Sequence, residues 1–233
     1  MRRVFAVVPA HNEAMTVAET VRALRQLPAE VVVVADACTD ETAQRAHETG
    51  ATVLVRRERG DKARALAKGL RWIQEQQPSD DDVVLLVDAD VGTSASEVTH
   101  LLEAVASNGT DMAIGVLPPA GRHGGFGLVA RFARWALQRR TGERFRAPLS
   151  GQRAMRWQTV RQLTALAGGF GVEVGMTIDV ARARARVQEV DVCMVHRHTG
   201  RSWRGFLHRA RQGWHVLLAS MGVRQVTLWT DDC

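Results

Sequence analysis

The feature that most constrains the fold of this chain is the regular alternation of short apolar runs with segments of helical periodicity. Five runs rich in valine, leucine and isoleucine occur in the first 118 residues: VFAVVPA, EVVVVADA, ATVLVRR, DVVLLVDAD and DMAIGVL. Runs that are apolar throughout, rather than at every second residue, are typical of strands covered on both faces. Strands that alternate with helices form open sheets with right-handed crossovers. The sequence therefore predicts an α/β fold, with an open, mainly parallel sheet and helices on both faces.

The segments between these runs carry apolar residues at helical spacing. Ala63, Leu66 and Leu70, for example, share one face of a predicted helix. The first predicted helix begins after Asn12, which is a suitable N-cap. Three further predicted helices cover residues 40–49, 61–76 and 94–107.

After residue 118 the alternation stops, but neither a low-complexity linker nor an internal repeat marks a second domain. The sequence predicts one domain over 1–233, made of a first half over 1–118 and a second half over 119–233. The second half is expected to contain, in order, a Gly/Pro loop, an amphipathic helix over 126–140, a turn or short strand over 147–156, a glycine loop and helix over 168–186, a strand with a polar end over 187–201, and a basic C-terminal helical element over 202–218.

The two halves carry opposite charge. Residues 1–119 contain 12 Lys and Arg against 18 Asp and Glu, whereas residues 120–233 contain 19 Arg against 7 acids and five of the six tryptophans. A basic half with this composition indicates an anionic partner, such as phosphate groups or a membrane surface, unless its arginines are only solvated. The basic residues are scattered and form no recognised nucleic-acid module.

Cysteine usage and hydropathy indicate a cytoplasmic protein. Cys38, Cys193 and Cys233 lack metal-binding spacing and are odd in number, which favours reduced thiols. No apolar run approaches the 18 residues of a membrane-spanning helix, and Pro9 interrupts the short run at the N-terminus, so a signal peptide is not expected. The expected location is the cytoplasm, including the inner face of the membrane.

Polar residues follow each of the first four runs, as PAHNE, ADACTD, RRERGDK and DAD. In open α/β sheets, ligands bind beyond the carboxyl ends of the strands, so these four clusters predict one site. Asp88 and Asp90 lie two residues apart, and on an extended chain their side chains point the same way. Such carboxylates suit Mg²⁺ or Mn²⁺, and a metal there would bind a diphosphate, although a bare D-x-D is often only a turn.

The motifs VVPAHNE, VVADACTDET, GDKARAL and VDAD occur in this order over residues 4–115. Together they resemble the nucleotide-sugar-binding half of the GT-A glycosyltransferases of the family-two group. The resemblance implies that donor binding involves Pro9, Ala10, His11, Glu13, Asp36, Gly60, Lys62, Asp88, Ala89, Asp90 and Glu173. Within this set, the first loop and Asp36 would hold the nucleoside, and Asp88 and Asp90 would meet ribose, metal and diphosphate. Asp36 fits a uracil or a guanine ring equally well.

The second half resembles the glucosyl-3-phosphoglycerate synthases and related retaining enzymes in the segments APLSGQRAMR, GGFGVEVGMTID and VDVCMVHRHTGR. The resemblance implies that Asp88, Asp90 and His196 bind the metal and that Glu173 contacts the transferred sugar. It also implies catalytic roles for Asp90, Glu173 and Lys62. The acceptor side would be lined by Ser150, Gly151, Arg122, Gly124 and Gly125. The chain departs from that pattern at Phe126 and Gly127, which replace polar and charged residues, and at Gln152, where an acid is usual.

These resemblances imply an enzyme, a metal-dependent hexosyltransferase that uses a UDP- or GDP-sugar and a small phosphorylated or other hydroxyl acceptor. The reaction would retain configuration, or else invert it with Glu173 or Asp179 as base. One alternative is a membrane-associated enzyme with a polyprenyl-phosphate or lipid acceptor, since both basic helices suit an anionic membrane. A sugar nucleotidyltransferase is disfavoured, because PAHNEA has neither Gly nor Arg after the first strand. A binding protein with a relic site is a weaker hypothesis, and assembly as a homodimer is compatible with the sequence.

Overall fold

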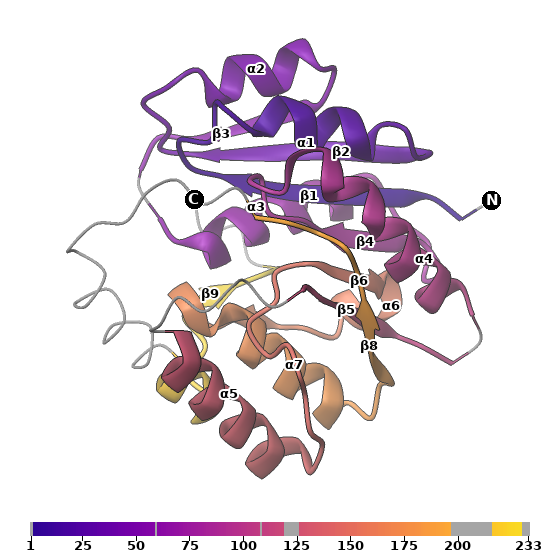
Figure 1. Cartoon of the computed structure of the whole chain (residues 1–233), viewed down its shortest axis with the longest axis vertical. Helices are drawn as coiled ribbons and strands as arrows, with labels where there is room; N and C mark the ends of the chain where they lie inside the picture. The colour runs from indigo at the N-terminus through magenta and orange to yellow at the C-terminus, as the bar shows by residue number, and fades with distance from the viewer. Residues whose placement is uncertain (1, 59, 108, 119–125, 197–215, 230–233) are drawn as a thin grey trace.

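The protein is described by a computed structural model that covers residues 2–58, 60–107, 109–118, 126–196 and 216–229 (Figure 1). The first part contains, in order, β1 (Val4–Ala10), α1 (Val17–Leu24), β2 (Ala29–Asp36), α2 (Thr42–Glu48), β3 (Thr52–Arg56), α3 (Lys62–Glu75), β4 (Val83–Leu86), the 3-10 helix η1 (Gly92–Glu97), α4 (Val98–Ala106) and β5 (Met112–Val116). The second part contains α5 (Phe126–Thr141), β6 (Arg153–Arg156), α6 (Trp157–Val160), β7 (Ala165–Leu166), the 3-10 helix η2 (Gly169–Gly171), α7 (Val172–Arg182), β8 (Val187–Asp191) and β9 (Val226–Thr227).

Seven strands form one sheet in the order β3-β2-β1-β4-β6-β5-β8. The pairs β3-β2, β2-β1, β1-β4 and β5-β8 are parallel, while β6 runs antiparallel to both β4 and β5. The predicted open, mainly parallel α/β sheet is confirmed. Strands from both sides of residue 118 share this sheet, and the assignment of 1–233 to one domain stays a prediction.

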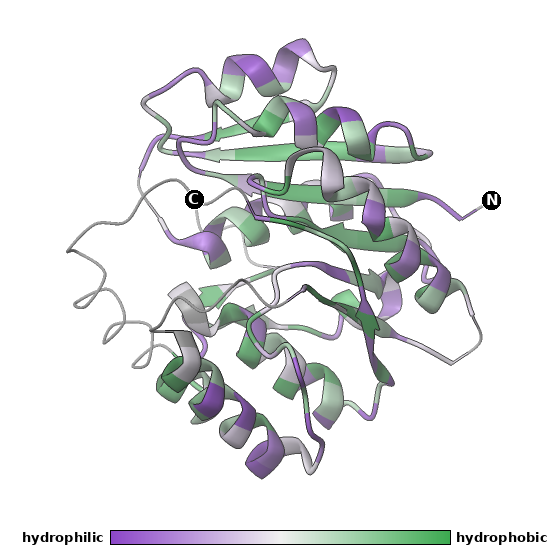
Figure 2. Cartoon of the chain, viewed as in Figure 1, coloured by the Kyte–Doolittle hydropathy of each residue, from purple (hydrophilic) through white to green (hydrophobic). Residues whose placement is uncertain are grey.

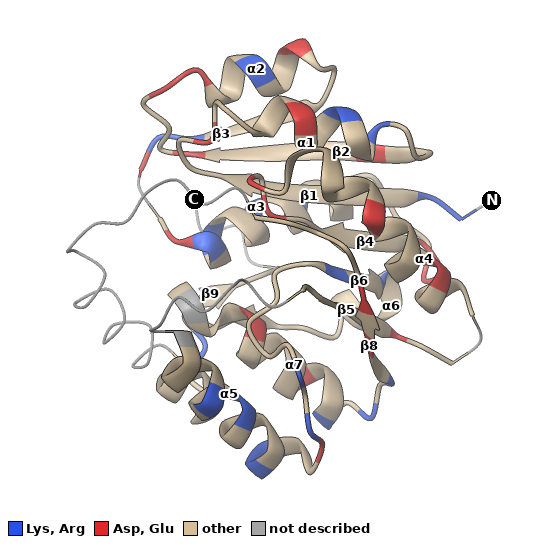
Figure 3. Ribbon diagram, viewed as in Figure 1, with Lys and Arg blue, Asp and Glu red and all other residues tan. Residues whose placement is uncertain are grey.

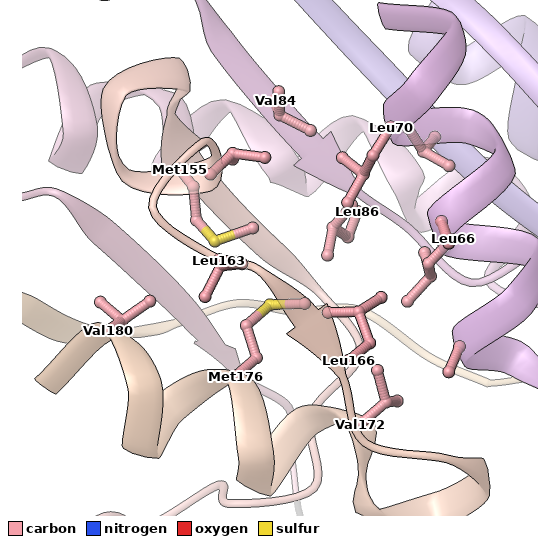
Figure 4. Close-up of a cluster of buried hydrophobic side chains, with 14 of the residues drawn as sticks. Leu66, Leu70, Val84, Leu86, Met155, Leu163, Leu166, Val172, Met176 and Val180 are labelled. Atoms are coloured by element: carbon pink, nitrogen blue, oxygen red, sulfur yellow. The ribbon is translucent and has the colours of Figure 1, made fainter. Parts of the chain in front are cut away.

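Each face of the sheet carries its own apolar core, which explains the unbroken apolar runs. On β1, Phe5 and Val7 belong to the core beneath α3, α5 and α7, whereas Ala6 and Val8 belong to the core beneath α1 and α4. Figure 2 shows the central strands β1, β2 and β4 largely apolar, whereas polar residues are frequent on the helices that cover the sheet. Figure 4 shows α3 contributing Leu66 and Leu70 to the first core, opposite side chains of the second half. The two halves of the chain are therefore packed against each other beside the sheet.

Two helix starts differ in how well the sequence predicted them. The first helix begins at Val17 rather than directly after Asn12, so the predicted N-cap is wrong. Asn12 instead adopts a positive φ of 57°, and its side-chain oxygen accepts a hydrogen bond from the Thr39 backbone N–H at 2.8 Å. By contrast, α3 begins as predicted, because the Asp61 carboxylate caps it by accepting from the Arg64 N–H at 3.1 Å.

The second half contains the amphipathic helix that the sequence predicted. Val129, Ala133 and Leu137 on α5 are buried in the core that also includes α7 residues. The basic C-terminal helical element falls largely on residues 197–215, outside the described residues, and only 216–220 are described as helical. Beyond it, β9 pairs antiparallel with β7. None of the helices in the described part of the chain combines the length and the apolar character needed to cross a bilayer.

Candidate active site

The carboxyl ends of β1, β2, β3 and β4 lie at one edge of the sheet, next to the beginning of α3 (Figure 1). Acidic and basic residues are present along this edge in Figure 3. The parallel register brings together the polar segments that follow these four strands. These segments therefore lie next to one another at one edge of the sheet.

The two aspartates of the D-x-D motif lie beyond the fourth strand. Strand β4 ends at Leu86, so both aspartates lie beyond the strand, and the chain turns at Ala89 and Asp90. Thr20 of α1 fixes this turn, because its buried hydroxyl donates to the Ala89 carbonyl and accepts from the Gly92 N–H, both at 2.9 Å. A residue nearly seventy positions away thus determines where the two carboxylates point.

The segment after β8 brings His196 to the same place. The backbone N–H groups of Cys193 and Val195 donate to the side chains of Glu97 (3.0 Å) and Ser94 (3.1 Å), which belong to η1. Held in this way, His196 donates from Nδ1 to Oδ1 of Asp90 at 2.8 Å. This hydrogen bond raises the pKa of His196 above its ordinary value, against the opposite effect of partial burial.

Asp88, Asp90 and His196 form a group of side chains that fits a divalent cation. One potential ligand atom from each lies within 4.8 Å of the other two. Two carboxylate oxygens and one imidazole nitrogen are a donor set suited to Mg²⁺ or Mn²⁺. The three residues come from opposite halves of the chain, so folding is required to assemble the set.

Lys62, the first residue of α3, bridges two carboxylates at the centre of the site. Its ammonium group lies 2.6 Å from Oδ1 of Asp88 and 2.8 Å from Oε1 of Glu173. Burial alone would lower the pKa of Lys62, but the two carboxylates raise it above its ordinary value. Burial likewise opposes ionisation of Asp88, yet Lys62 lowers its pKa, with smaller contributions from His196 and Gln152. The site therefore holds Lys62 as a cation and Asp88 as an anion.

The loop before β6 closes over Asp88 from the other side. The Gln152 side chain is fully buried; its Nε2 donates to Oδ2 of Asp88 at 2.8 Å and its Oε1 accepts from the Asp88 N–H at 3.2 Å. Beside it, a Cβ added to Gly151 would lie 2.5 Å from Nζ of Lys62 and 2.7 Å from Oδ1 of Asp88. Only glycine lets the backbone approach this ion pair so closely.

Replacing Gly151 with alanine is expected to weaken Mn²⁺ binding about ten-fold, because the new methyl group displaces Asp88 and Lys62. Isothermal titration with Mn²⁺ measures the effect. Gly127→Ala is the matched control, since a Cβ at Gly127 would meet nothing within 4 Å. Equal Mn²⁺ affinities for the two variants would contradict the close approach of the Gly151 backbone to Lys62 and Asp88.

Glu173 reaches Lys62 because a glycine loop is tied to the start of α3. The second carboxylate oxygen of Asp61 accepts from the Gly169 N–H at 2.6 Å. Gly169 has a positive φ of 56° and opens η2, directly before α7. Glu173 then lies in the first turn of α7, where a carboxylate is favoured by the helix dipole, and its side chain is only 10% exposed.

The residues expected at the nucleoside end lie where β1 and β2 finish. Asp36 is buried, pairs with the guanidinium of Arg56 and accepts a long hydrogen bond of 3.4 Å from the Gly60 N–H. His11 donates from Nδ1 to the Asp36 carbonyl at 2.6 Å. Pro9 and Ala10 are the last residues of β1.

Glu13 lies in the loop between β1 and α1. Burial raises the pKa of Glu13, and the negative charge of Asp90 raises it further. The Glu13 backbone is held by α2, because its N–H donates to the Thr42 hydroxyl at 2.8 Å. The Glu13 carboxylate is therefore sensitive to the charge of the D-x-D motif.

Of the predicted acceptor residues, the structure describes two. Ser150 precedes Gly151 beside the Lys62–Asp88 pair, and its hydroxyl accepts from the Gln152 N–H at 3.3 Å. The remaining three, Arg122, Gly124 and Gly125, lie outside the described residues. Asp179, the second candidate base, is bound through both carboxylate oxygens by Arg224, at 2.6 and 2.7 Å.

Sequence reasoning did not assign a role to four residues that shape this site: Thr20, Arg56, Gln152 and Arg153. Each acts on residues far away in the chain, as Gln152 does on Asp88 across 64 positions. Nothing in their local sequence indicates such partners. The capping role of Asp61 does have a local signal, because an aspartate directly before an apolar-periodic segment is a common helix start.

A mixed, mostly parallel sheet, with two aspartates beyond its fourth strand and a histidine brought from the second half, defines a GT-A fold. The sequence profile of glycosyl transferase family 2 matches residues 5–162. The chain belongs to this family.

Solved structures and a curated relative agree with that assignment. Glucosyl-3-phosphoglycerate synthase from Mycobacterium tuberculosis, in complex with Mn²⁺, UDP-glucose and phosphoglyceric acid, superimposes with a TM-score of 0.77 and 26% identity, covering 96% of this chain and 81% of that one. Its complex with Mg²⁺ and UDP gives the same values. Glycosyltransferase AglJ from Haloferax volcanii is 29% identical over 181 residues, which are 76% of this chain and 57% of AglJ. The chain thus spans little more than half the length of this curated relative.

Proposed function

We propose that this protein transfers a hexose from a nucleoside-diphosphate sugar to a hydroxyl group of a small phosphorylated acceptor, with Mg²⁺ or Mn²⁺ as cofactor. The observation that carries the proposal is the convergence of Asp88, Asp90 and His196 within 4.8 Å, at the sheet edge of a family-2 glycosyltransferase. The mycobacterial enzyme, similar over nearly the whole chain, binds Mn²⁺, UDP-glucose and phosphoglyceric acid or glycerol 3-phosphate.

In this proposal, the residues around Asp88, Asp90 and His196 share the binding of the donor. The carboxylate of Asp36 would accept from a base N–H after exchanging its contact with Arg56, and Pro9, Ala10, His11 and Glu13 would surround the nucleoside. Gly60 and Lys62 would lie over the diphosphate. Glu173 would accept hydrogen bonds from sugar hydroxyl groups and orient the hexose.

In the transfer, the bond from the anomeric carbon to the diphosphate oxygen breaks, and a bond from that carbon to the acceptor oxygen forms. The acceptor proton passes to the departing diphosphate when configuration is retained. A bound Mg²⁺ or Mn²⁺ supplies Lewis-acid stabilisation of the charge on that leaving group. Lys62 adds a second positive charge, already fixed in place by Asp88 and Glu173. If configuration is inverted, Glu173 remains the candidate base, since Asp179 is held by Arg224.

A thermal-shift panel of UDP- and GDP-sugars with Mn²⁺ tests the donor, because a bound donor stabilises the folded state by mass action. The donor found is then incubated with 3-phosphoglycerate or glycerol 3-phosphate, and the product is identified by mass spectrometry. We expect Mn²⁺-dependent stabilisation by one donor and a glycosylated acceptor. Stabilisation by none of the donors would contradict the proposal, and pyrophosphate release from UTP with a sugar 1-phosphate would instead show a nucleotidyltransferase.

A second candidate, a lipid-linked phosphate as acceptor, is favoured by the outer face of α5. Leu128 and Trp135 are 74% and 59% exposed, and Trp135 stacks on Phe132 with ring centroids 5.6 Å apart. Spacings of four and three residues place these side chains on one stripe, beside the buried stripe, and Phe132 also packs partly against the core. The same helix has no acidic residue and four exposed arginines, namely Arg131, Arg134, Arg139 and Arg140. Figure 3 shows the basic bands along α5.

The charge of this face favours an anionic lipid surface over a second copy of the chain. Two copies that met symmetrically through α5 would place the arginines of one helix against those of the other. An anionic bilayer instead attracts the arginines and accepts Leu128 and Trp135 at its interface.

Flotation with phosphatidylglycerol vesicles, and with phosphatidylcholine vesicles for comparison, tests this surface. We expect salt-sensitive binding to the anionic vesicles alone, and loss of that binding in Trp135→Ser combined with Leu128→Ser. Val55→Ser is the control, because Val55 is 55% exposed on the edge strand β3. Concentration-dependent dimers without vesicle binding, or an absence of binding, would overturn the lipid candidate.

A further inference from the structure

Arg153 is a charged residue in the middle of the protein whose role the proposed mechanism leaves open. It opens β6, the strand between β4 and β5, and is only 1% exposed. Its Nε donates to the Ser150 carbonyl at 3.0 Å, and its Nη1 donates to the Thr177 hydroxyl of α7 at 3.0 Å. Its Nη2 is buried and has no hydrogen-bond partner among the described residues. Buried donors of this kind nearly always have a partner, so a ligand for Nη2 is expected.

A small cavity lies beside this side chain, between α3, β4, β6 and α7. Its volume is about 10 Å³, roughly the space that one water molecule occupies. The polar lining residues are Lys62, Glu173 and Arg153, and the remaining lining residues are Leu66, Leu86, Gly151, Val172 and Met176. A phosphate group is too large for this space, whereas a water molecule fits and finds polar partners there.

Charge connects Arg153 with the same carboxylates that Lys62 bridges. Burial lowers the pKa of Arg153 to about 10, and the negative charges of Glu173 and Asp88 oppose this effect, with a smaller contribution from Glu189. The guanidinium therefore stays charged at neutral pH. Arg153 and Glu173 line the same small cavity, where Lys62 contacts Oε1 of Glu173 at 2.8 Å.

We propose that Arg153 is a positioning residue for Glu173 and acts through one buried water that accepts from Nη2 and donates to the Glu173 carboxylate. The proposal rests on the proposed function in one respect, the contact of Glu173 with the transferred sugar. Lys62 has to serve two carboxylates and the donor diphosphate. The Arg153–water contact gives Glu173 a second attachment, so that the orientation of its carboxylate does not depend on Lys62 alone.

The test compares Arg153→Met and Arg153→Lys with Arg156→Met. Arg156 lies on the same strand and is largely buried, but it binds the Thr110 and Val105 carbonyls at 3.3 and 3.1 Å, away from the site. We expect Arg153→Met to lower kcat about 10- to 100-fold with Kd for donor and Mn²⁺ unchanged. Arg156→Met should lower Tm alone, and Arg153→Lys should retain an intermediate kcat.

A crystal structure of the wild-type protein at high resolution gives a readout that does not depend on activity. We expect a water within hydrogen-bond distance of both Nη2 of Arg153 and the Glu173 carboxylate. An occupied cavity in a protein without transferase activity would refute the proposed function and leave the water contact standing. An empty cavity, or equal kcat for Arg153→Met and Arg156→Met, would overturn the positioning role. If Arg153→Met fails to fold, the kcat of Arg153→Lys and the presence of the water in the wild-type structure test the positioning role instead.

Discussion

Replacing Asp90 with alanine is expected to lower kcat for sugar transfer by about 10²- to 10³-fold, the largest single effect on activity that the site predicts. Asp90 is one of the three candidate metal ligands, and its Oδ1 also holds His196 at 2.8 Å. Its removal therefore takes away one ligand and a hydrogen bond that orients the imidazole of a second. The measurement is the initial rate of nucleoside-diphosphate release at several Mn²⁺ concentrations.

Two features of that experiment distinguish a metal role from general damage. Asp81→Ala is the matched control, since the Asp81 side chain is 71% exposed and pairs only with Arg2 and Arg156 among the described residues. It should leave kcat and Mn²⁺ affinity unchanged. The Asp90 variant should need a higher Mn²⁺ concentration for half-maximal rate. Equal rates for wild type and Asp90→Ala would remove Asp90 from the chemistry.

The sheet was largely predictable because its physical signal is local. Strands such as β1 and β4 are buried on both faces, so each reads as an unbroken apolar run wherever it lies in the chain. The antiparallel insertion of β6 was less visible, since Arg153 opens the strand and a buried arginine breaks the apolar pattern. The start of α1 was wrong because Asn12 uses its side chain on Thr39, a contact between two loops.

The main residues of the site were predictable from the sequence, but the contacts that hold these residues in place were not. The convergence of polar strand ends follows from parallel topology, and the resemblance to known motifs pointed to His196 and Glu173. The contacts that orient these residues join positions far apart, such as Thr20 with Ala89 and Asp61 with Gly169. Single-sequence patterns describe spacing along the chain and contain no information on such pairs.

These supporting contacts also explain how so many charges coexist at one place. Lys62 pairs with Asp88 and Glu173 at the centre, Arg153 lines the same small cavity, and His196 donates to Asp90 at the edge. Each of the three carboxylates therefore has an ion-pair or hydrogen-bond partner before a metal or donor arrives. The site is therefore preorganised for a ligand that brings both a divalent cation and a diphosphate.

Replacing Lys62 with methionine is expected to lower the free energy of unfolding by about 2 kcal/mol at neutral pH. Breaking a buried ion pair costs about 3–5 kcal/mol, and the lower figure allows for side chains that are 29% exposed at Lys62 and 22% at Asp88. Lys68→Met is the control, because Lys68 lies on the same helix and donates only to the Val55 carbonyl among the described residues. Urea titration measures the free energy of unfolding of both variants. Equal values for Lys62→Met and Lys68→Met would contradict a stabilising role of the Lys62 ion pairs.

The pH dependence of that difference tests its electrostatic origin. The pKa of Asp88 is lowered in the folded protein, so its stabilisation is present above its ordinary value of 3.8 and is lost as pH falls further. The pKa of Lys62 is raised, so its stabilisation is present below its ordinary value of 10.5 and is lost as pH rises further. The gap between wild type and Lys62→Met should therefore be largest between about pH 5 and 9 and should shrink at acid pH. Excess Mn²⁺ should restore part of the stability of the variant, since a divalent cation beside Asp88 replaces the missing charge. A gap that does not shrink at acid pH would show that Lys62 stabilises the fold by packing alone.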